Sequence, residues 1–319
     1  MKAIVFTRYG SPEVLELHEL DKPLPQDDQI LIQVRAASVN AMEWRPFTLP
    51  RIFLRLIAGW NEPRDKSLGV DASGCVEAVG RAVTQFQPGD EVFGIARGAF
   101  AEYVCTTEAR LVRKPANVSF EAAAAVPVAA LTALQAVRDH GRVQAGQAVA
   151  INGAGGGVGT FAVQIAKALG ADVTAICSSR NQEIARSLGA DRTIDYSRED
   201  FTRGGRRYDV IVAANGHHSV LEYRRALAPR GRLVVLGGSF TQMFQTLLAG
   251  WFLSLLDGRT YRGMITKPNH DDLVTLQQML ETGKVVPAID RCYPLTSVRE
   301  AIEYLIAGHA SGKVVIKVC

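Results

Sequence analysis

The sequence predicts an α/β protein that combines a doubly wound parallel sheet with a second, β-rich unit. Two observations predict this fold class. In the middle of the chain, short apolar strands alternate with helical segments, and parallel strands need such crossovers. Before residue 120, strand patterns bounded by turn residues follow one another, which indicates a partly open barrel or sandwich. At 319 residues, the chain is long enough for two separate cores.

The glycine-rich run at residues 153–159 is expected to be a phosphate-binding turn. An apolar strand precedes it at residues 148–151, and Phe161, Ile165 and Leu169 recur every four residues after it. Glycines let the backbone approach a pyrophosphate, and the helix that follows offers unpaired N–H groups and the positive end of its dipole. A flexible surface loop is the alternative, but the flanking strand and helix favour a dinucleotide-binding site. The predicted cofactor-binding residues here are Ala154, Gly155, Gly156, Gly157, Val158 and Gly159.

The residues after the second strand of this sheet indicate which dinucleotide binds. An NAD site places an Asp or Glu there, on the ribose hydroxyls. This chain has Ser178, Ser179 and Arg180 after a strand at residues 172–176, and no acid at that carboxyl end. Hydroxyl donors and a guanidinium favour a 2'-phosphate, so NADP is the expected cofactor and these three residues are expected to bind it. A serine that caps the next helix is the alternative, and both roles can hold at once.

Further strands of the same sheet are expected at residues 192–194, 209–212 and 232–236. Ligands of an open parallel sheet bind outside the carboxyl ends of its strands. Asn215 and Gly216 follow one of these strands, and Gly237 and Gly238 follow another. All four are therefore expected to line the cofactor site, with plain tight-turn glycines as the alternative for the last two.

Charge and cysteine content argue against several classes of protein. Lys and Arg number 36 against 32 Asp and Glu, and the net charge of +4 is spread along the chain, so no nucleic-acid partner is expected. The five cysteines are far apart and form no short metal spacing, which indicates reduced thiols in a cytoplasmic protein. The amino terminus starts a strand and lacks the apolar stretch of an export signal.

Two apolar segments, residues 46–60 and 244–256, are not expected to span a membrane; the second covers 13 residues with Gln245 inside. A buried helix is the plain interpretation of the second segment. A cover over a substrate pocket, a dimer contact and an interfacial anchor are the alternatives.

The β-rich unit is expected to contain strands at residues 30–39, 74–79, 90–95 and 100–105. Late in the chain, a helix at residues 271–281 precedes a second helix that begins with a capping box, Ser297-x-x-Glu300. A final strand at residues 313–317 needs a partner, and the nearest candidate is the amino-terminal sheet. The chain is therefore expected to cross back, which makes the first domain discontinuous.

Six motifs are spread along the chain: residues 69–74 (GVDASG), 88–94 (PGDEVFG), 98–103 (GAFAEY), 129–133 (AALTA), the glycine turn, and 312–315 (GKVV). Together they resemble the medium-chain dehydrogenase/reductase superfamily, in its zinc-free quinone oxidoreductase-like branch. The resemblance implies a GroES-like catalytic domain, residues 1–123 and 264–319, wrapped around a Rossmann NADP-binding domain, residues 124–263. NADPH and substrate would lie in the cleft between them, and the resemblance also implies a homodimer.

The resemblance assigns roles to single residues as well. Thr132 would face the nicotinamide or its ribose, and Tyr196 matches a position beside the adenosine 2'-phosphate, with plain aromatic packing as the alternative. Gly312 and Lys313 belong to a family motif and are predicted to bind the cofactor.

No metal is expected. Zinc-binding members of the superfamily carry Gly-His-Glu where this chain has Gly69-Val70-Asp71, and a Cys near the position of Asn40. Both ligands and the cysteine cluster of the structural zinc lobe are missing. Without zinc, a simple alcohol lacks its usual Lewis-acid activation, which favours an electron-poor acceptor. The expected reaction is hydride transfer from the nicotinamide to a quinone or an α,β-unsaturated carbonyl.

Asn40 and Arg45 are the predicted catalytic residues, together with Thr132. The amide of Asn40 could donate a hydrogen bond to a carbonyl oxygen that gains charge, and Arg45 could stabilise an enolate. A turn residue at a strand end and a solvated surface charge are the respective alternatives. The chain is thus expected to be an NADPH-dependent quinone or enone reductase. A zinc-free alcohol or aldehyde oxidoreductase and an NADPH-binding regulatory protein without turnover are the rival hypotheses.

Overall fold

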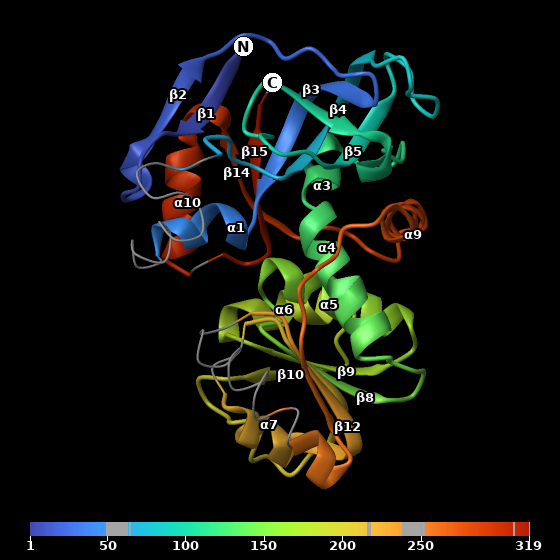
Figure 1. Cartoon of the computed structure of the whole chain (residues 1–319). Helices are drawn as coiled ribbons and strands as arrows, with labels where there is room; N and C mark the ends of the chain where they lie inside the picture. The colour runs from blue at the N-terminus through green and yellow to red at the C-terminus, as the bar shows by residue number, and fades with distance from the viewer. Residues whose placement is uncertain are drawn as a thin grey trace. The chain divides into compact units, whose positions relative to one another are not determined.

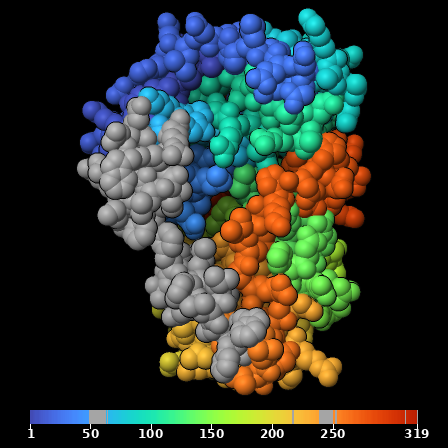
Figure 2. Space-filling model, in the orientation of Figure 1, coloured from blue at the N-terminus to red at the C-terminus, as the bar shows by residue number. Residues whose placement is uncertain are grey.

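The structure, a computed structural model of the 319-residue chain, describes residues 1–48, 63, 65–215, 218–237, 250, 253–308 and 310–318. The remaining residues are drawn in grey (Figures 1 and 2). The predictions for Gly216 and Gly238, and most of those for the two apolar segments, therefore lie outside the described residues.

The chain folds into two compact units. The first comprises Met1–Val128, Pro268–Thr282 and Pro287–Cys319. The second comprises Ala129–Lys267 and Gly283–Val286. The chain thus leaves the first unit and returns to it. The boundaries predicted for the catalytic and the NADP-binding domain, at 123/124 and 263/264, stay a prediction.

The second unit is built on a six-stranded parallel sheet with the order β10-β9-β8-β11-β12-β13 (Figure 1). The strands are β8 (Ala148–Asn152), β9 (Asp172–Cys177), β10 (Arg192–Asp195), β11 (Tyr208–Ala213), β12 (Leu227–Val235) and β13 (Thr260–Gly263). The chain runs from β8 outward through β9 to β10 and then returns to the other side of β8 as β11. This reversal confirms the doubly wound sheet and puts its switch point at the carboxyl end of β8.

Helices cover both faces of this sheet. In Figure 1, α5 (Gly157–Ala168) and α6 (Gln182–Ser187) lie on one side, and α7 (Val220–Ala226) lies on the other. Phe161 and Ile165 of α5 are fully buried, as their four-residue spacing predicts. Leu169, the third residue of that spacing, is 36% exposed, because α5 ends at Ala168 and Leu169 is its C-cap. The central strands β8, β9 and β11 are buried along almost their whole length, which matches their largely apolar sequences.

The first unit contains a β-hairpin and a seven-stranded sheet with the order β14-β15-β3-β4-β5-β7, with β6 paired to β3. The hairpin is β1 (Lys2–Phe6) and β2 (Leu15–Glu19); the sheet strands are β3 (Gln29–Val39), β4 (Asp71–Val79), β5 (Glu91–Ile95), β6 (Tyr103–Thr107), β7 (Leu111–Arg113), β14 (Ile289–Pro294) and β15 (Lys313–Lys317). Val314 of β15 lies opposite Val39 of β3 in an antiparallel ladder. The prediction that the terminal strand joins the amino-terminal sheet is confirmed.

In the described part of the chain, four α-helices belong to this unit, and α4 (Pro127–Leu134) runs from the first unit into the second. The four are α1 (Ala41–Trp44), α3 (Phe120–Ala124), α9 (His270–Glu281) and α10 (Val298–Ile306). The capping box predicted at the start of α10 is wrong, because Ser297 makes no side-chain cap bond there. Ser297 ends the 3-10 turn Leu295–Ser297, so its backbone (φ −112°, ψ 26°) is not extended as a capping residue requires.

Candidate functional site

The glycine turn of the second unit joins β8 to α5 at the switch point of the sheet. Gly153 has φ +87°, which favours glycine, and its backbone N–H donates to the carbonyl of Ile176 in β9. A Cβ on Gly159 would lie 2.0 Å from the carbonyl oxygen of Gly153. A Cβ on Gly155 would lie 2.2 Å from the Asn181 side-chain nitrogen. These glycines are required by the packing of the turn itself.

Gly156 has a different environment. It is the N-cap of α5, with extended backbone, and an added Cβ would come no closer than 3.5 Å to any described atom. The space beside Gly156 is therefore open, at the point where the first N–H groups of a 12-residue helix have no partner within the helix. Open space, free donors and the positive end of a helix dipole fit the pyrophosphate of a dinucleotide.

The end of β9 holds the predicted 2'-phosphate residues. Ser178 precedes the 3-10 turn Ser179–Asn181, and both Ser179 and Arg180 are exposed. Tyr196, the next predicted residue, is 61% exposed and follows β10. The structure thus gathers these residues at neighbouring strand ends of one sheet.

The structure also places an acid at this edge, which the residues directly after β9 do not reveal. Asp195, the last residue of β10, pairs in register with Cys177, the last residue of β9. Its carboxylate accepts a hydrogen bond from the Ser179 hydroxyl and two more from Ser197. The Ser179 hydrogen bond is the first of the contacts that lower the pKa of Asp195. The expectation of no acid at this carboxyl end is therefore wrong for the folded sheet, because the acid comes from the neighbouring strand.

Two more predicted cofactor residues lie at the same sheet edge. Asn215 follows β11 and is exposed, and its backbone nitrogen lies 2.8 Å from the position of a Cβ added to Gly153. Gly237 follows β12 and is buried. Thr132 lies in α4, where its hydroxyl contacts that of Thr266 at 2.7 Å. These observations place the residues; their roles toward a cofactor stay predictions.

The first unit contains a buried polar cluster around Asn40, defined by Ser38, Asn40, Glu43, Asp71 and Lys313. Asn40 follows β3 and is the N-cap of α1, and it is 9% exposed. Its side-chain nitrogen donates to Asp71 Oδ2 at 2.9 Å, and its side-chain oxygen accepts from Lys313 Nζ at 2.5 Å. A carboxylate only accepts and an ammonium only donates, so the orientation of the Asn40 amide is determined by its partners.

Asp71 is the acceptor at the centre of this cluster. Its Oδ2 also accepts from the Ser38 hydroxyl at 2.8 Å, and its Oδ1 accepts from the Val128 backbone N–H at 3.0 Å. Lys313 Nζ lies 3.7 Å from Asp71 Oδ2 and donates to the Val39 carbonyl at 3.2 Å. Burial raises the pKa of Asp71, while the charge of Lys313 and these hydrogen bonds oppose that rise. Burial likewise lowers the pKa of Lys313.

The sequence signal for this cluster was only partial. Asn40 was predicted as catalytic, whereas Lys313 was predicted to bind the cofactor, a role that stays a prediction. Gly312, with φ +110°, lets the backbone turn into β15, and an added Cβ would lie 2.3 Å from the Ala288 carbonyl oxygen. Arg45 opens the 3-10 turn Arg45–Phe47 after α1 and is half-buried. Asp71 lies in the motif at residues 69–74, but the sequence does not predict that it meets Ser38 and Glu43, because these contacts exist only once β3, β4 and β15 pair.

These residues do not fit a zinc ion. The position of the histidine ligand of zinc-binding members is Val70, and the oxygens of Asp71 are already engaged by three donors. The ammonium of Lys313, 3.7 Å from Asp71, would repel a cation. In the described part of the chain, no three His, Cys, Asp or Glu side chains gather as a metal-binding group.

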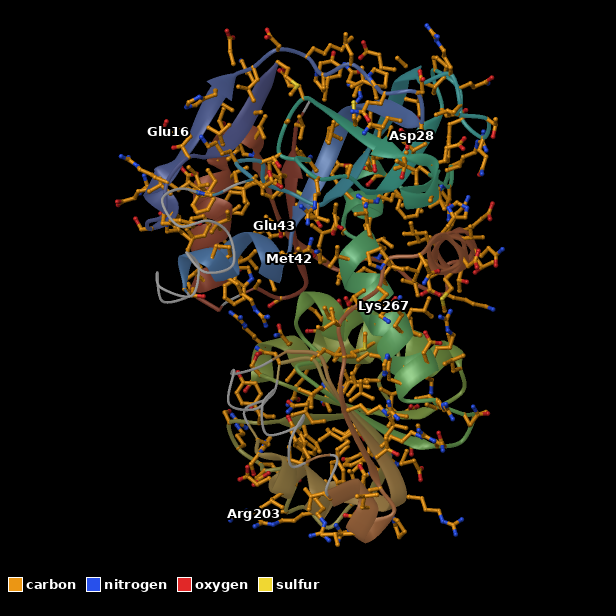
Figure 3. All side chains as sticks on the ribbon, viewed as in Figure 1. Glu16, Asp28, Met42, Glu43, Arg203 and Lys267 are labelled. Atoms are coloured by element: carbon orange, nitrogen blue, oxygen red, sulfur yellow. The ribbon has the colours of Figure 1, made fainter. Side chains whose placement is uncertain are left out.

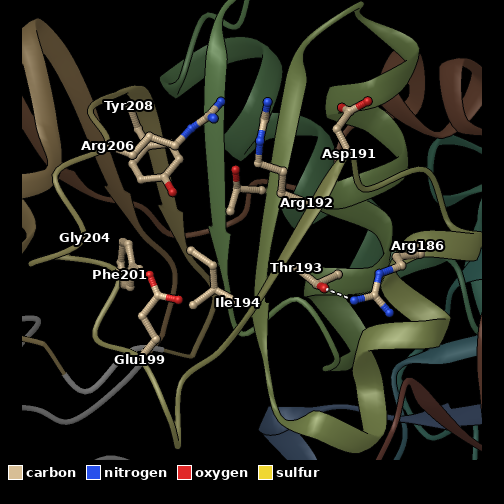
Figure 4. A pocket seen from close by; sticks show the side chains of 11 residues that line it. Arg186, Asp191, Arg192, Thr193, Ile194, Glu199, Phe201, Gly204, Arg206 and Tyr208 are labelled. Atoms are coloured by element: carbon tan, nitrogen blue, oxygen red, sulfur yellow. Dashed lines mark hydrogen bonds between the residues drawn. The ribbon is translucent and has the colours of Figure 1, made fainter.

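A cavity of about 470 Å³ lies at the other end of the second unit's sheet (Figure 4). Thr174, Arg206 and Tyr208 line it, and each carries a buried polar atom without a hydrogen-bond partner among the described residues. Arg186 donates to Thr193 on its far side. Because Arg206 and Tyr208 stand at the amino end of β11, this cavity is separate from the glycine turn. A polar cavity of this size has room for water molecules that could bond these atoms.

A parallel sheet with a glycine turn at its switch point, joined to a β-rich unit with a buried polar cluster, defines a dinucleotide-linked oxidoreductase. Comparisons with known proteins specify the family. Residues 26–116 match the alcohol dehydrogenase GroES-like domain, and residues 188–316 match a family described as zinc-binding dehydrogenase. The GroES-like assignment of the first unit is thereby confirmed.

Relatives of the chain carry oxidoreductase names. The chloroplast envelope quinone oxidoreductase homolog of Arabidopsis thaliana is 31% identical, over 99% of this chain and 98% of the relative. The chloroplastic NADPH-dependent alkenal/one oxidoreductase of the same plant is 32% identical, over 99% of this chain and 79% of the relative. The quinone oxidoreductase structure from Coxiella burnetii is 31% identical with a TM-score of 0.88, over 100% of this chain and 99% of that one.

The chain belongs to the medium-chain dehydrogenase/reductase family, in its quinone oxidoreductase branch. It is therefore an NAD(P)-binding oxidoreductase. The described part of the chain contains no helix that is both long enough and apolar enough to cross a membrane. The expected cytoplasmic location and the expected dimer stay predictions.

Proposed function

We propose that the protein reduces a quinone or an α,β-unsaturated carbonyl with NADPH, without a metal ion. The observation that carries this proposal is the position of Asn40, whose amide is held between the ammonium of Lys313 and the carboxylate of Asp71. The relatives named as quinone and alkenal/one oxidoreductases support the same class of acceptor.

The Asn40 side chain would supply the hydrogen bond to the acceptor. Its nitrogen carries two hydrogens, of which one is donated to Asp71. The second is the proposed donor to the acceptor oxygen as that oxygen gains negative charge. Lys313, which donates to the amide oxygen, withdraws electron density from the amide and strengthens the N–H group as a donor. Arg45, five residues further along, is the proposed second positive group near a developing enolate.

The bound nicotinamide would supply the hydride, and the chain's residues would bind and orient the two reactants. Residues 154–159 at the amino end of α5 would hold the pyrophosphate, with Gly156 giving it room. Thr132, fixed by its contact with Thr266, is the proposed residue beside the nicotinamide.

The proposed preference for NADPH rests on Ser178, Arg180 and Tyr196. The Asp195 carboxylate opposes it, because a negative charge at this edge repels a 2'-phosphate. Ser179 donates its hydroxyl hydrogen to Asp195, which leaves Arg180 as the main proposed contact to the phosphate. The preference is therefore expected to depend on Arg180 more than on the serines.

The test is the loss of NADPH and of NADH absorbance, followed in parallel with the purified chain and a panel of quinones, enals, enones and aldehydes. Faster turnover of quinones or enones with NADPH than with NADH would support the proposal. Faster turnover with NADH would overturn the cofactor assignment, and turnover restricted to aldehydes would favour the alcohol or aldehyde oxidoreductase. Binding of NADPH without turnover of any acceptor would favour a regulatory protein.

A further inference from the structure

Glu43 is the one ionisable member of the cluster around Asn40 that the proposed function does not use. It lies in α1, three residues after Asn40 and beside the exposed Met42 (Figure 3). The side chain of Glu43 is only 2% exposed. Its Oε2 accepts the backbone N–H of Asn40 at 2.7 Å, whereas its buried Oε1 has no hydrogen-bond partner among the described residues.

The two carboxyl groups of the cluster have unequal support for a negative charge. Asp71 accepts three hydrogen bonds and lies 3.7 Å from Lys313 Nζ. Glu43 accepts one. Hydrogen bonds to the ionised form stabilise it, so the charge belongs on Asp71 and a buried Glu43 with an orphaned oxygen belongs in its neutral form.

The charge balance of the cluster leads to the same assignment. Lys313 supplies one positive charge, and it is 3% exposed. An ionised Asp71 neutralises it. An ionised Glu43 would leave a net charge of −1 in a region from which water is excluded, and such uncompensated buried charge is strongly unfavourable.

We propose that Glu43 carries a proton in the working enzyme, and that its neutrality keeps a second negative charge away from Asn40. Glu43 is thus a positioning residue: it holds the Asn40 backbone through Oε2 and adds no field that opposes charge on the acceptor oxygen. The catalytic part of this inference rests on the proposed function, because it assumes that the acceptor oxygen lies beside Asn40. The protonation state of Glu43 does not depend on the proposed function.

The surroundings of Glu43 support this assignment. Burial, followed by the charge of Asp71, raises the pKa of Glu43 from 4.5 to about 8, against the opposing charge of Lys313. Asp71 on β4 and Lys313 on β15 are the charged groups that face it. On α10, which packs against α1, the charged side chains Arg299, Glu300 and Glu303 are exposed, and Arg45 follows α1 directly.

A direct consequence concerns the pH dependence of the reaction. Below the pKa of about 8, Glu43 is neutral and the cluster is balanced. Above it, Glu43 ionises and the new charge opposes the developing oxyanion. The kcat/KM for the acceptor is then expected to fall by about tenfold per pH unit, as for the loss of a single required proton.

The protonation state can be measured without substrate by infrared difference spectroscopy of the full chain. The wild type is expected to show the C=O stretch of a buried carboxylic acid below the pKa and to lose it above the pKa. The substitution Glu43→Gln is expected to remove this band. In Asp71→Asn, Lys313 needs a new counter-charge, so Glu43 is expected to ionise and the band is expected to disappear below the pKa as well. The exposed Glu300→Gln is the matched control and is expected to leave the band in place.

The catalytic consequence is tested by the pH profile of acceptor reduction. The fall of kcat/KM at alkaline pH is expected in the wild type and in Glu300→Gln. It is expected to be absent in Glu43→Gln. Absence of the carboxylic-acid C=O band from the wild-type spectrum would overturn the assignment of a neutral Glu43. Because this spectrum needs only the wild type, the test does not depend on whether a variant folds. An alkaline fall that persists in Glu43→Gln would overturn the catalytic role. An acid band without turnover of any acceptor would contradict the proposed function but not the protonation state.

Discussion

The Lys313 ammonium donates a 2.5 Å hydrogen bond to the side-chain oxygen of Asn40, across 273 residues of sequence. This contact exists because β15 returns to pair with β3, so that Lys313 and Asn40 stand at the same end of adjacent strands. It makes the last strand of the chain part of the proposed catalytic site. If Asn40 acts as proposed, the same contact would strengthen its amide N–H as a donor to the acceptor oxygen.

Removal of the Lys313 charge should destabilise the fold as well as slow the reaction. Lys313→Met leaves Asp71 as a buried carboxylate without a counter-charge, which is expected to lower the free energy of unfolding by about 3 kcal/mol. The double variant Asp71→Asn/Lys313→Met removes both charges and should recover part of that loss. Urea unfolding of the two single variants and the double variant measures the coupling; strictly additive effects would show that the pair does not interact.

The two kinds of glycine in the turn should respond differently to alanine. Gly159→Ala places a Cβ 2.0 Å from a backbone oxygen, so a large drop in melting temperature is expected. Gly156→Ala meets open space and should melt near the wild-type temperature, while its methyl group weakens NADPH binding. Calorimetry of the cofactor complex checks the second variant. Unchanged NADPH affinity in Gly156→Ala would place the pyrophosphate elsewhere.

Cofactor preference should depend on the balance between Arg180 and Asp195. Arg180→Ala removes a charge-assisted contact and is expected to lower the preference for NADPH over NADH by about ten- to a hundredfold. Asp195→Asn removes the opposing charge and is expected to raise that preference. The ratio of kcat/KM for the two cofactors is the measurement, with the exposed Arg225→Ala of α7 as the matched control. An unchanged ratio in Arg180→Ala would remove the argument for NADP.

Acid should weaken the second unit through Asp257. Burial acts to raise its pKa, but the Arg259 backbone N–H, the Tyr261 hydroxyl and the guanidiniums of Arg224 and Arg259 lower the pKa of Asp257 to about 2. A group whose pKa is lower in the folded state stabilises the fold above its unfolded pKa of about 4 and loses that contribution as the pH falls toward 2.

The variant Asp257→Asn tests this pH dependence. Its free energy of unfolding should be lower than that of the wild type at neutral pH and should change less between pH 4 and pH 2. If the free energy of unfolding falls equally in the two proteins between pH 4 and pH 2, other carboxylates dominate the acid dependence of stability. Chemical unfolding at a series of pH values gives both quantities.

The sequence predicted the elements whose signals are local. The apolar strand before residue 152, the glycine turn and the four-residue spacing of Phe161 and Ile165 all lie within about 20 residues of one another, and the structure confirms the sheet and helix that they predict. The return of the terminal strand was also predictable, because an unpaired strand needs a neighbour.

The site depended on contacts that no local pattern records. Asp195 reaches the end of β9 only through the parallel register of β9 and β10. Glu43 and Asp71 meet Lys313 only when three strands and α1 come together in one unit. The capping box at Ser297 failed for the converse reason, since a preceding 3-10 turn overrode a correct local motif.

In the proposed mechanism, the Asn40 amide stabilises the developing negative charge on the acceptor. The most direct test is the rate of hydride transfer, measured by stopped flow in a single turnover with NADPH and an enone or quinone acceptor. Asn40→Ala is expected to slow this step by about a hundred- to a thousandfold, the effect of removing one donor to an oxyanion, with NADPH affinity nearly unchanged. A hydride-transfer rate within a few-fold of wild type in a folded Asn40→Ala would exclude this role of the Asn40 amide.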